Sequence, residues 1–192
     1  MDKSALPLVS LFSSIIGQEG EQNGAYRLYL DRVPSSSPFL TPVPASFAWS
    51  ALQLFTLPDS CNYSLSKVNL TIFPPLAVNG GPIAVLKPKD QVLSLSANLT
   101  SSKMAKEYVG KDGKGLYATF VSGAQLPASV AARNVKWENS TITFEATFPY
   151  KKLVAHGFSH VSLTTMSNIS DVDSVPDYTL AAPGVIQVQN SL

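Results

Sequence analysis

The sequence is short of the residues on which disulfide-stapled and metal-bound domains depend. Its 192 residues include one cysteine, Cys61, and two histidines, so no intrachain disulfide can close and no Cys/His set has zinc-site spacing. A chain of this length buries about 70% of its unfolded surface on folding, which is enough for ordinary stability without a disulfide or a structural metal. We therefore expect no metal and no cofactor.

Charged residues are scarce as well. They make up 14% of the chain, against about 25% in an average soluble domain, and the net charge is +1. This balance argues against a domain whose main task is to bind the nucleic-acid backbone, since such binding needs clustered Lys and Arg. A surface made polar mainly by Ser, Thr, Asn and Gln is easier to bury between subunits, because fewer charges lose their water.

No apolar run is long enough to span a bilayer, so no membrane contact is expected. The apolar stretch at residues 5–16 has the length of a signal peptide, but Pro7 interrupts it and no small-residue cleavage pattern follows. We interpret residues 1–24 as an N-terminal arm that docks on a neighbouring subunit. Its predicted interface residues are Leu8, Val9, Leu11, Phe12, Ile15 and Ile16.

Residues 25–45 are predicted to be an extended connector rich in proline and serine. Four prolines and three serines fall between Val33 and Pro44, and such a stretch cannot join the middle of a sheet. Residues 46–192 then form one domain, which gives the chain an arm, a connector and a body.

Period-two alternation dominates the body. In Thr141–Phe148 every second residue is apolar, and Ser66–Phe73 repeats the pattern through Val68, Leu70 and Ile72. Strands with one buried face produce this alternation. Strands are expected at residues 25–33, 47–56, 66–73, 83–86, 92–97, 116–121, 131–137, 141–148, 160–166 and 185–189.

One short helix is expected, over Ser101–Tyr108, where Thr100 or Ser101 can act as the N-terminal cap. A parallel sheet would need several crossover helices. The pattern therefore predicts an all-β, antiparallel sandwich of about eight to ten strands with one short helix.

Catalytic and metal-binding patterns are weak. His156 and His160 are four residues apart, but the β-rich sequence that follows predicts a strand, on which this spacing separates the two rings. The 13 carboxylates form no recognisable catalytic pair, so no enzyme is expected. The acidic residues Asp171, Asp173 and Asp177 have the oxygen ligands that calcium prefers, but the glycine and terminal glutamate of an EF-hand are absent and a solvated loop is the favoured explanation.

The layout from Cys61 to Met166 resembles the single jelly-roll coat proteins of small icosahedral viruses, and most of all the tymovirus-like ones, which also lack a basic arm. The resemblance lies in a strand followed by prolines at residues 64–75, a short strand ending in proline at 83–88, and residues 115–120 after a polar helical segment. Two departures are a more helical Ser101–Tyr108 and a weak final strand in Tyr178–Gln189.

The resemblance implies a jelly-roll sandwich. It also implies a structural capsid protein that assembles in the host cell into an icosahedral virion shell enclosing the genome. The partners would be other copies of the chain or related coat subunits, with weak electrostatic contact to packaged nucleic acid.

A binding module is the alternative interpretation. Such a β-sandwich would recognise carbohydrate or protein through its loops, with Trp49 and Trp137 as contact residues. Glycosylation would favour it, and the sequence has Asn-x-Ser/Thr triplets at Asn62, Asn69, Asn98, Asn139 and Asn168.

Overall fold

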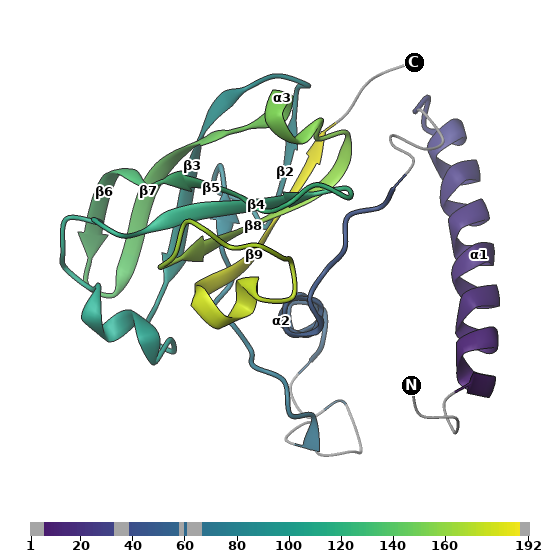
Figure 1. The fold of residues 1–192 in the computed structure, drawn as a ribbon, viewed down its shortest axis with the longest axis horizontal. Coiled ribbons are helices and arrows are strands. Elements are labelled where there is room, and N and C mark those ends of the chain that lie inside the picture. Colours follow the sequence, from purple (N-terminus) through teal and green to yellow (C-terminus); the bar gives the residue numbers. More distant parts are fainter. Residues whose placement is uncertain (1–5, 33–38, 58–59, 61–66, 189–192) are drawn as a thin grey trace.

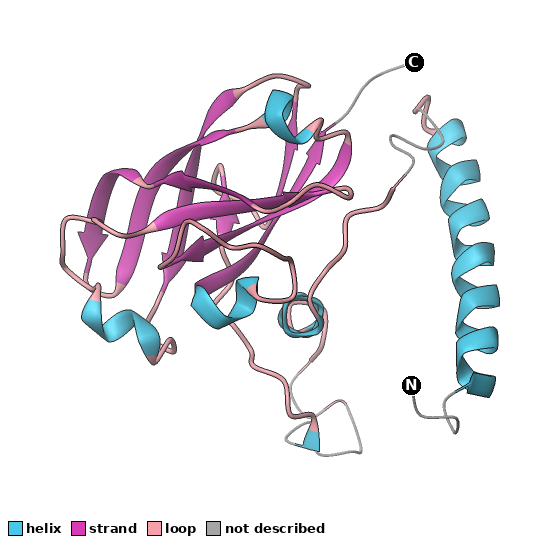
Figure 2. Cartoon of the chain, in the orientation of Figure 1, coloured by secondary structure: helices cyan, strands magenta, loops and turns pink. Residues whose placement is uncertain are grey.

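Two β-sheets packed face to face form the body of the protein in a computed structural model that describes residues 6–32, 39–57, 60 and 67–188 (Figure 1). The described residues contain nine strands, which confirms the predicted β-sandwich. Figure 2 shows the strands gathered in the body and the long N-terminal helix standing outside it.

The smaller sheet has four antiparallel strands. Its order is β1 (Ala77–Val78), β3 (Gln91–Asn98), β7 (Thr141–Phe148) and β6 (Arg133–Glu138). Alternation is clearest here: Leu95 pairs with Phe144 and both are buried, whereas Ser94 and Thr143 face solvent. One face of this sheet is therefore exposed to solvent, as the sequence pattern predicts.

The larger sheet has five strands. Its order is β2 (Ile83–Leu86), β9 (Thr179–Val188), β8 (Gly157–Thr164), β4 (Tyr117–Ser122) and β5 (Ala128–Ala131). The pair β2–β9 is parallel, so the prediction of a wholly antiparallel sandwich is wrong there. A parallel pair needs a long crossover, and the chain from β3 to β8, which passes through strands of both sheets, supplies it.

The three central strands of the larger sheet, β9, β8 and β4, are buried on both faces. The inner face of this sheet joins the main core around Phe120, Leu163 and Ile186. Its outer face carries a second apolar cluster, in which Phe47 and Phe73 meet edge to face at 5.4 Å between ring centroids. This explains why β4, β8 and β9 are buried almost continuously and do not alternate.

Helices are more frequent than predicted. Within the described residues they are α1 (Leu6–Tyr29), α2 (Ala45–Leu52) and α3 (Tyr150–Leu153), with 3₁₀ turns η3 (Met104–Glu107) and η4 (Val175–Tyr178). The strands predicted at 25–33 and 47–56 are therefore wrong, since α1 includes residues 25–29 and α2 includes residues 47–52. The helix predicted over Ser101–Tyr108 is reduced to the single turn η3.

Physical reasons for these differences are local. In α2, Phe47 and Ser50 are three residues apart and share the buried side of a helix, a period that the short apolar run concealed. In α1, alternation at residues 26–30 lies at the end of a helix that is already formed, and extending a helix by one residue is easier than nucleating a new element.

The strand predictions at 83–86 and 141–148 hold with the same ends, and those at 92–97, 116–121, 131–137, 160–166 and 185–189 hold with shifted ends. The segment predicted at 131–137 divides into β5 and β6, and the final strand is not weak, because β9 has ten residues and lies between β2 and β8. The strand predicted at 66–73 is wrong within the described residues, since residues 67–73 belong to no sheet.

The strand β9 passes very close to β1 and to Leu76 just before it. A Cβ atom placed on Gly184 would lie 2.7 Å from Cγ2 of Val78 and 2.9 Å from the carbonyl oxygen of Leu76. Real Cβ contacts are not this short, so the two segments can approach only because position 184 has no side chain.

Truncating the centre of the main core should destabilise the fold strongly. Phe144 is fully buried, so Phe144→Ala should lower the free energy of unfolding by about 3–5 kcal/mol. The neighbouring change Thr143→Ala, on the exposed face of the same strand, should alter it by less than about 0.5 kcal/mol. Urea unfolding of both variants tests this, and equal losses would contradict the described facing of β7.

Candidate functional site

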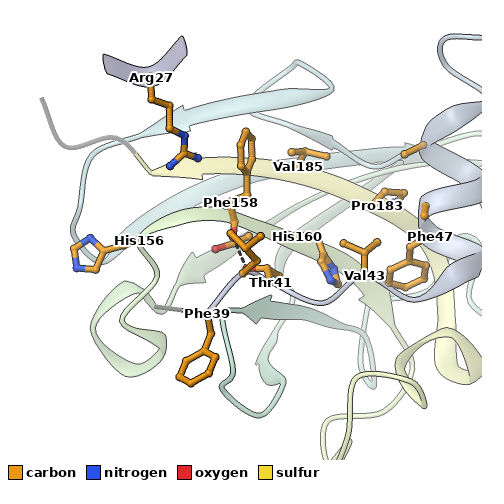
Figure 3. Close-up of a pocket in the computed structure, with 14 residues that line it drawn as sticks. Arg27, Phe39, Thr41, Val43, Phe47, His156, Phe158, His160, Pro183 and Val185 are labelled. Atoms are coloured by element: carbon orange, nitrogen blue, oxygen red, sulfur yellow. Dashed lines mark hydrogen bonds between the residues drawn. The ribbon is translucent and has the colours of Figure 1, made fainter. Parts of the chain in front are cut away.

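An apolar pocket of about 440 Å³ lies on the outer face of the larger sheet, between residues 39–51 and strands β8 and β9 (Figure 3). It is lined by Arg27, Phe39, Leu40, Thr41, Val43, Phe47, Ala48, Ala51, His156, Phe158, Ser159, His160, Pro183 and Val185. Its size is within the usual range of small-molecule pockets.

The stretch of chain before α2 forms one wall of the pocket because it is fastened to the sheet. The hydroxyl of Thr41 donates to the carbonyl oxygen of Phe158 on β8, and it accepts from the peptide N–H of Gly123, at 2.8 Å, after β4. These two bonds join one side chain to two strands. Residues 39–44 thus lie over the sheet without forming a helix or a strand, whereas residues 25–29 of the predicted connector belong to α1.

His160 forms a third hydrogen bond between the sheet and the chain before α2. Its Nε2 lies 3.0 Å from the carbonyl oxygen of Pro42. A carbonyl oxygen can only accept, so Nε2 carries the hydrogen, and Nδ1 of the neutral ring is an acceptor. That Nδ1 atom is buried and has no hydrogen-bond partner among the described residues.

Burial controls the charge of this histidine. The ring is only 4% exposed and meets Phe47 edge to face, with 5.6 Å between ring centroids. Desolvation lowers the pKa of His160, and the hydrogen bond to Pro42 raises it by a smaller amount. The neutral ring is therefore the stable form at neutral pH, and it holds the connector against β8 without burying a charge.

The rim of the pocket carries one cation. The guanidinium carbon of Arg27, from α1, lies 5.9 Å from the centre of the Phe158 ring. Figure 3 shows Arg27 above this ring, while Phe39 and His156 lie farther from the end formed by His160 and Phe47. No carboxylate is among the lining residues, so the pocket combines an apolar wall with a cation–π pair at its rim.

The structure does not bring the two histidines together. The ring of His156 packs edge to face on Tyr150, whose hydroxyl lies 3.1 Å from Nε2. In the part of the chain that the structure describes, no three His, Cys, Asp or Glu side chains are gathered as a metal site.

Asp171 has a structural role in its loop. Its carboxylate accepts hydrogen bonds of 2.7 Å from both the peptide N–H and the hydroxyl of Ser174. These bonds lower the pKa of Asp171, the side-chain bond most strongly. Asp173 is exposed, and Asp177 lies in η4, so the three acidic residues that sequence analysis considered for calcium do not form a common group.

The six predicted interface residues lie elsewhere, on the first half of α1. Their side chains are 39–64% exposed. Among the described residues no helix is both long enough and apolar enough to cross a membrane. The pocket itself was not foreseen, although the unbroken run of small and apolar residues in β9 is the signal of a strand covered on both faces.

Acidification should weaken the attachment of the connector. Because burial lowers the pKa of His160, the unfolded chain binds this proton more readily, so the free energy of unfolding falls as pH drops below about 6.5. The slope from one group is at most about 1.4 kcal/mol per pH unit. His160→Gln keeps a donor for Pro42 without titrating, so the variant should lose this part of the slope. Urea unfolding between pH 8 and pH 5 measures both proteins, and identical pH curves would refute the assignment.

Comparison of the sequence with protein-family models and with curated proteins finds no match.

Proposed function

We propose that the chain is a structural coat protein whose β-sandwich has jelly-roll topology and assembles with other copies or related subunits into an icosahedral viral shell around the genome. The observation that carries the proposal is the row of exposed apolar side chains on the first half of α1. Leu8, Leu11, Phe12 and Ile15 recur at helical spacing, so they share one side of the helix.

This side of α1 is costly to leave in water. Fully burying one large apolar side chain contributes about 1.5–3 kcal/mol. Phe12 is 57% exposed and Ile16 is 64% exposed, and in the view of Figure 1 the first half of the helix stands apart from the sandwich, which Arg27 in the second half reaches at Phe158. A neighbouring subunit can cover several such side chains at once, which is the role expected of an arm.

The composition of the body supports repeated contacts between subunits. A chain with 14% charged residues loses little charge solvation when its faces are covered by neighbours. The sandwich also ends in edge strands, among them β2, β5 and β6. Neighbours in a closed shell would cover such edges and prevent uncontrolled pairing.

Contact with packaged nucleic acid would be weak and electrostatic. Lys103, Lys106, Lys111 and Lys114 are exposed around η3, but Glu107 and Asp112 offset part of their charge. Assembly in this proposal is therefore driven by contacts between proteins, and it should depend only modestly on salt.

A binding module is the second candidate, and the apolar pocket is the observation that favours it. Trp137 gives this candidate little support, because its indole N–H is bonded to the carbonyl oxygen of Lys111 at 2.7 Å and its ring packs against the main core. A protein that stays monomeric at high concentration and binds a small apolar ligand would fit this candidate better than the coat protein.

Particle formation tests the proposal directly. The purified chain should elute from size-exclusion columns as large species, and negative-stain microscopy should show uniform closed shells. A chain that remains monomeric across protein concentration, salt and pH would contradict the proposal.

The arm can be tested separately. Deleting residues 1–17 should leave a folded body, since the arm adds nothing to the two apolar cores, but it should reduce or alter particle formation. The point variant Phe12→Ser/Ile16→Ser should have the same effect. The matched control Ser10→Ala/Ser13→Ala changes exposed polar positions of the same helix and should assemble normally. Unchanged particles from the truncated chain would remove the arm from the proposal.

A further inference from the structure

Residues 67–72 have the sequence of a strand but no sheet. The segment reads Lys-Val-Asn-Leu-Thr-Ile, in which β-branched residues are frequent and apolar and polar residues alternate. All six residues are exposed, and the apolar side chains of Val68, Leu70 and Ile72 are 39%, 39% and 55% exposed. A strong strand pattern without burial indicates that the burying surface is not in the same chain.

The peptide groups of residues 68–72 are unpaired in the part of the chain that the structure describes, where no hydrogen bond joins their backbone to any other residue. The next residues differ, since the N–H of Phe73 donates to Ser50 Oγ at 2.9 Å and the carbonyl oxygen of Pro74 accepts from Ala182 at 2.9 Å. The segment is therefore fastened at its C-terminal end and open to a partner along its length.

The surroundings of the segment are apolar too. After α2, the side chains of Leu52, Leu54, Phe55 and Leu57 are 48–79% exposed. Lys67 is the one charged residue in ranges 52–57 and 67–72. In Figure 1 residues 67–72 run outside both layers before the chain reaches β1. An exposed apolar surface with so little charge is typical of an interaction site.

We propose that residues 67–72 form an antiparallel strand pair with the same segment of a second copy of this chain, with Leu70 opposite Leu70. This inference rests on the self-association that the proposed function requires, and it names one of the contacts. The pairing supplies the hydrogen bonds that the open backbone lacks. It is an isologous contact, so it closes between two copies.

The register follows from the alternation. With Leu70 on the twofold axis, Val68 of each copy lies opposite Ile72 of the other, and Asn69 lies opposite Thr71. All apolar side chains then share one face, on which directly opposite pairs stabilise each other. A slip of one residue would place apolar side chains opposite polar ones.

A second copy is the partner that the chemistry favours. The segment is its own apolar complement, and in this register Lys67 lies opposite Phe73 and does not face a second lysine. The edge strand β6 is a poorer partner, because it has Arg133 and Lys136 exposed. A two-stranded ribbon alone is marginally stable, so the exposed leucines after α2 would add apolar cover in the dimer.

Cysteine crosslinking tests the register, in a chain whose natural Cys61 is replaced by serine. Directly opposite Cα atoms in an antiparallel pair are about 4.5–5.5 Å apart, which suits a disulfide. Leu70→Cys should therefore give a covalent dimer on mild oxidation. Val68→Cys alone should not, because its copies lie four residues apart along the strand, about 13 Å. Val68→Cys combined with Ile72→Cys should again crosslink. Non-reducing electrophoresis reads all three.

Charge substitution tests the energetics. Leu70→Asp would place two carboxylates opposite each other on the apolar face, so it should weaken dimerisation at least about tenfold in sedimentation experiments. The matched control Asn69→Asp adds the same charge on the polar face, opposite Thr71, and should weaken dimerisation less. Circular dichroism establishes that both variants remain folded.

The outcomes separate this inference from the proposed function. Shells that form while Leu70→Cys gives no dimer, or while Val68→Cys crosslinks equally well, would overturn the strand pair and leave the coat protein standing. A dimer with the expected crosslinks but no shells would support the strand pair and contradict the coat-protein proposal. A chain with no self-association at all would contradict both.

Discussion

Coverage of the outer face of the five-stranded sheet is the constraint on which the rest of the structure depends. A sheet that is buried on both faces needs a covering layer on each face. The smaller sheet covers only the inner face. The other layer is built from α2, the connector before it, Phe73 and residues 169–178, all of which lie outside the regular sheets. Phe47 of α2 contacts both Phe73 and His160.

The irregular layer on the outer face explains where the apolar pocket and the buried His160 lie. The apolar pocket is the space left between the connector and α2 on one side and β8 and β9 on the other. The same segments fasten through polar atoms such as Thr41 and His160, because peptide groups that cross a sheet without joining it must find partners elsewhere. The buried histidine is thus a product of how this face is covered.

The sequence predicts the regular part of the fold well. The alternation of β3 and β7 identifies strands of the sheet that has one wet face. It fails where both faces are buried or where a partner lies outside the chain: β9 looks weak because nothing alternates, and residues 67–72 look like a strand although the described chain offers them no ladder. The pocket is beyond sequence analysis, since its walls come from residues 27, 39–51 and 156–185.

The close passage at Gly184 restricts how this protein can evolve. Most core positions accept another apolar residue of similar volume, but at this position even one methyl group would meet a backbone oxygen that cannot move aside. Divergent relatives that keep the same sheet order should therefore retain glycine between the proline at 183 and the apolar residue at 185, after most other identities have disappeared. This short signature in β9 offers a criterion for recognising homologues that overall sequence similarity does not reveal.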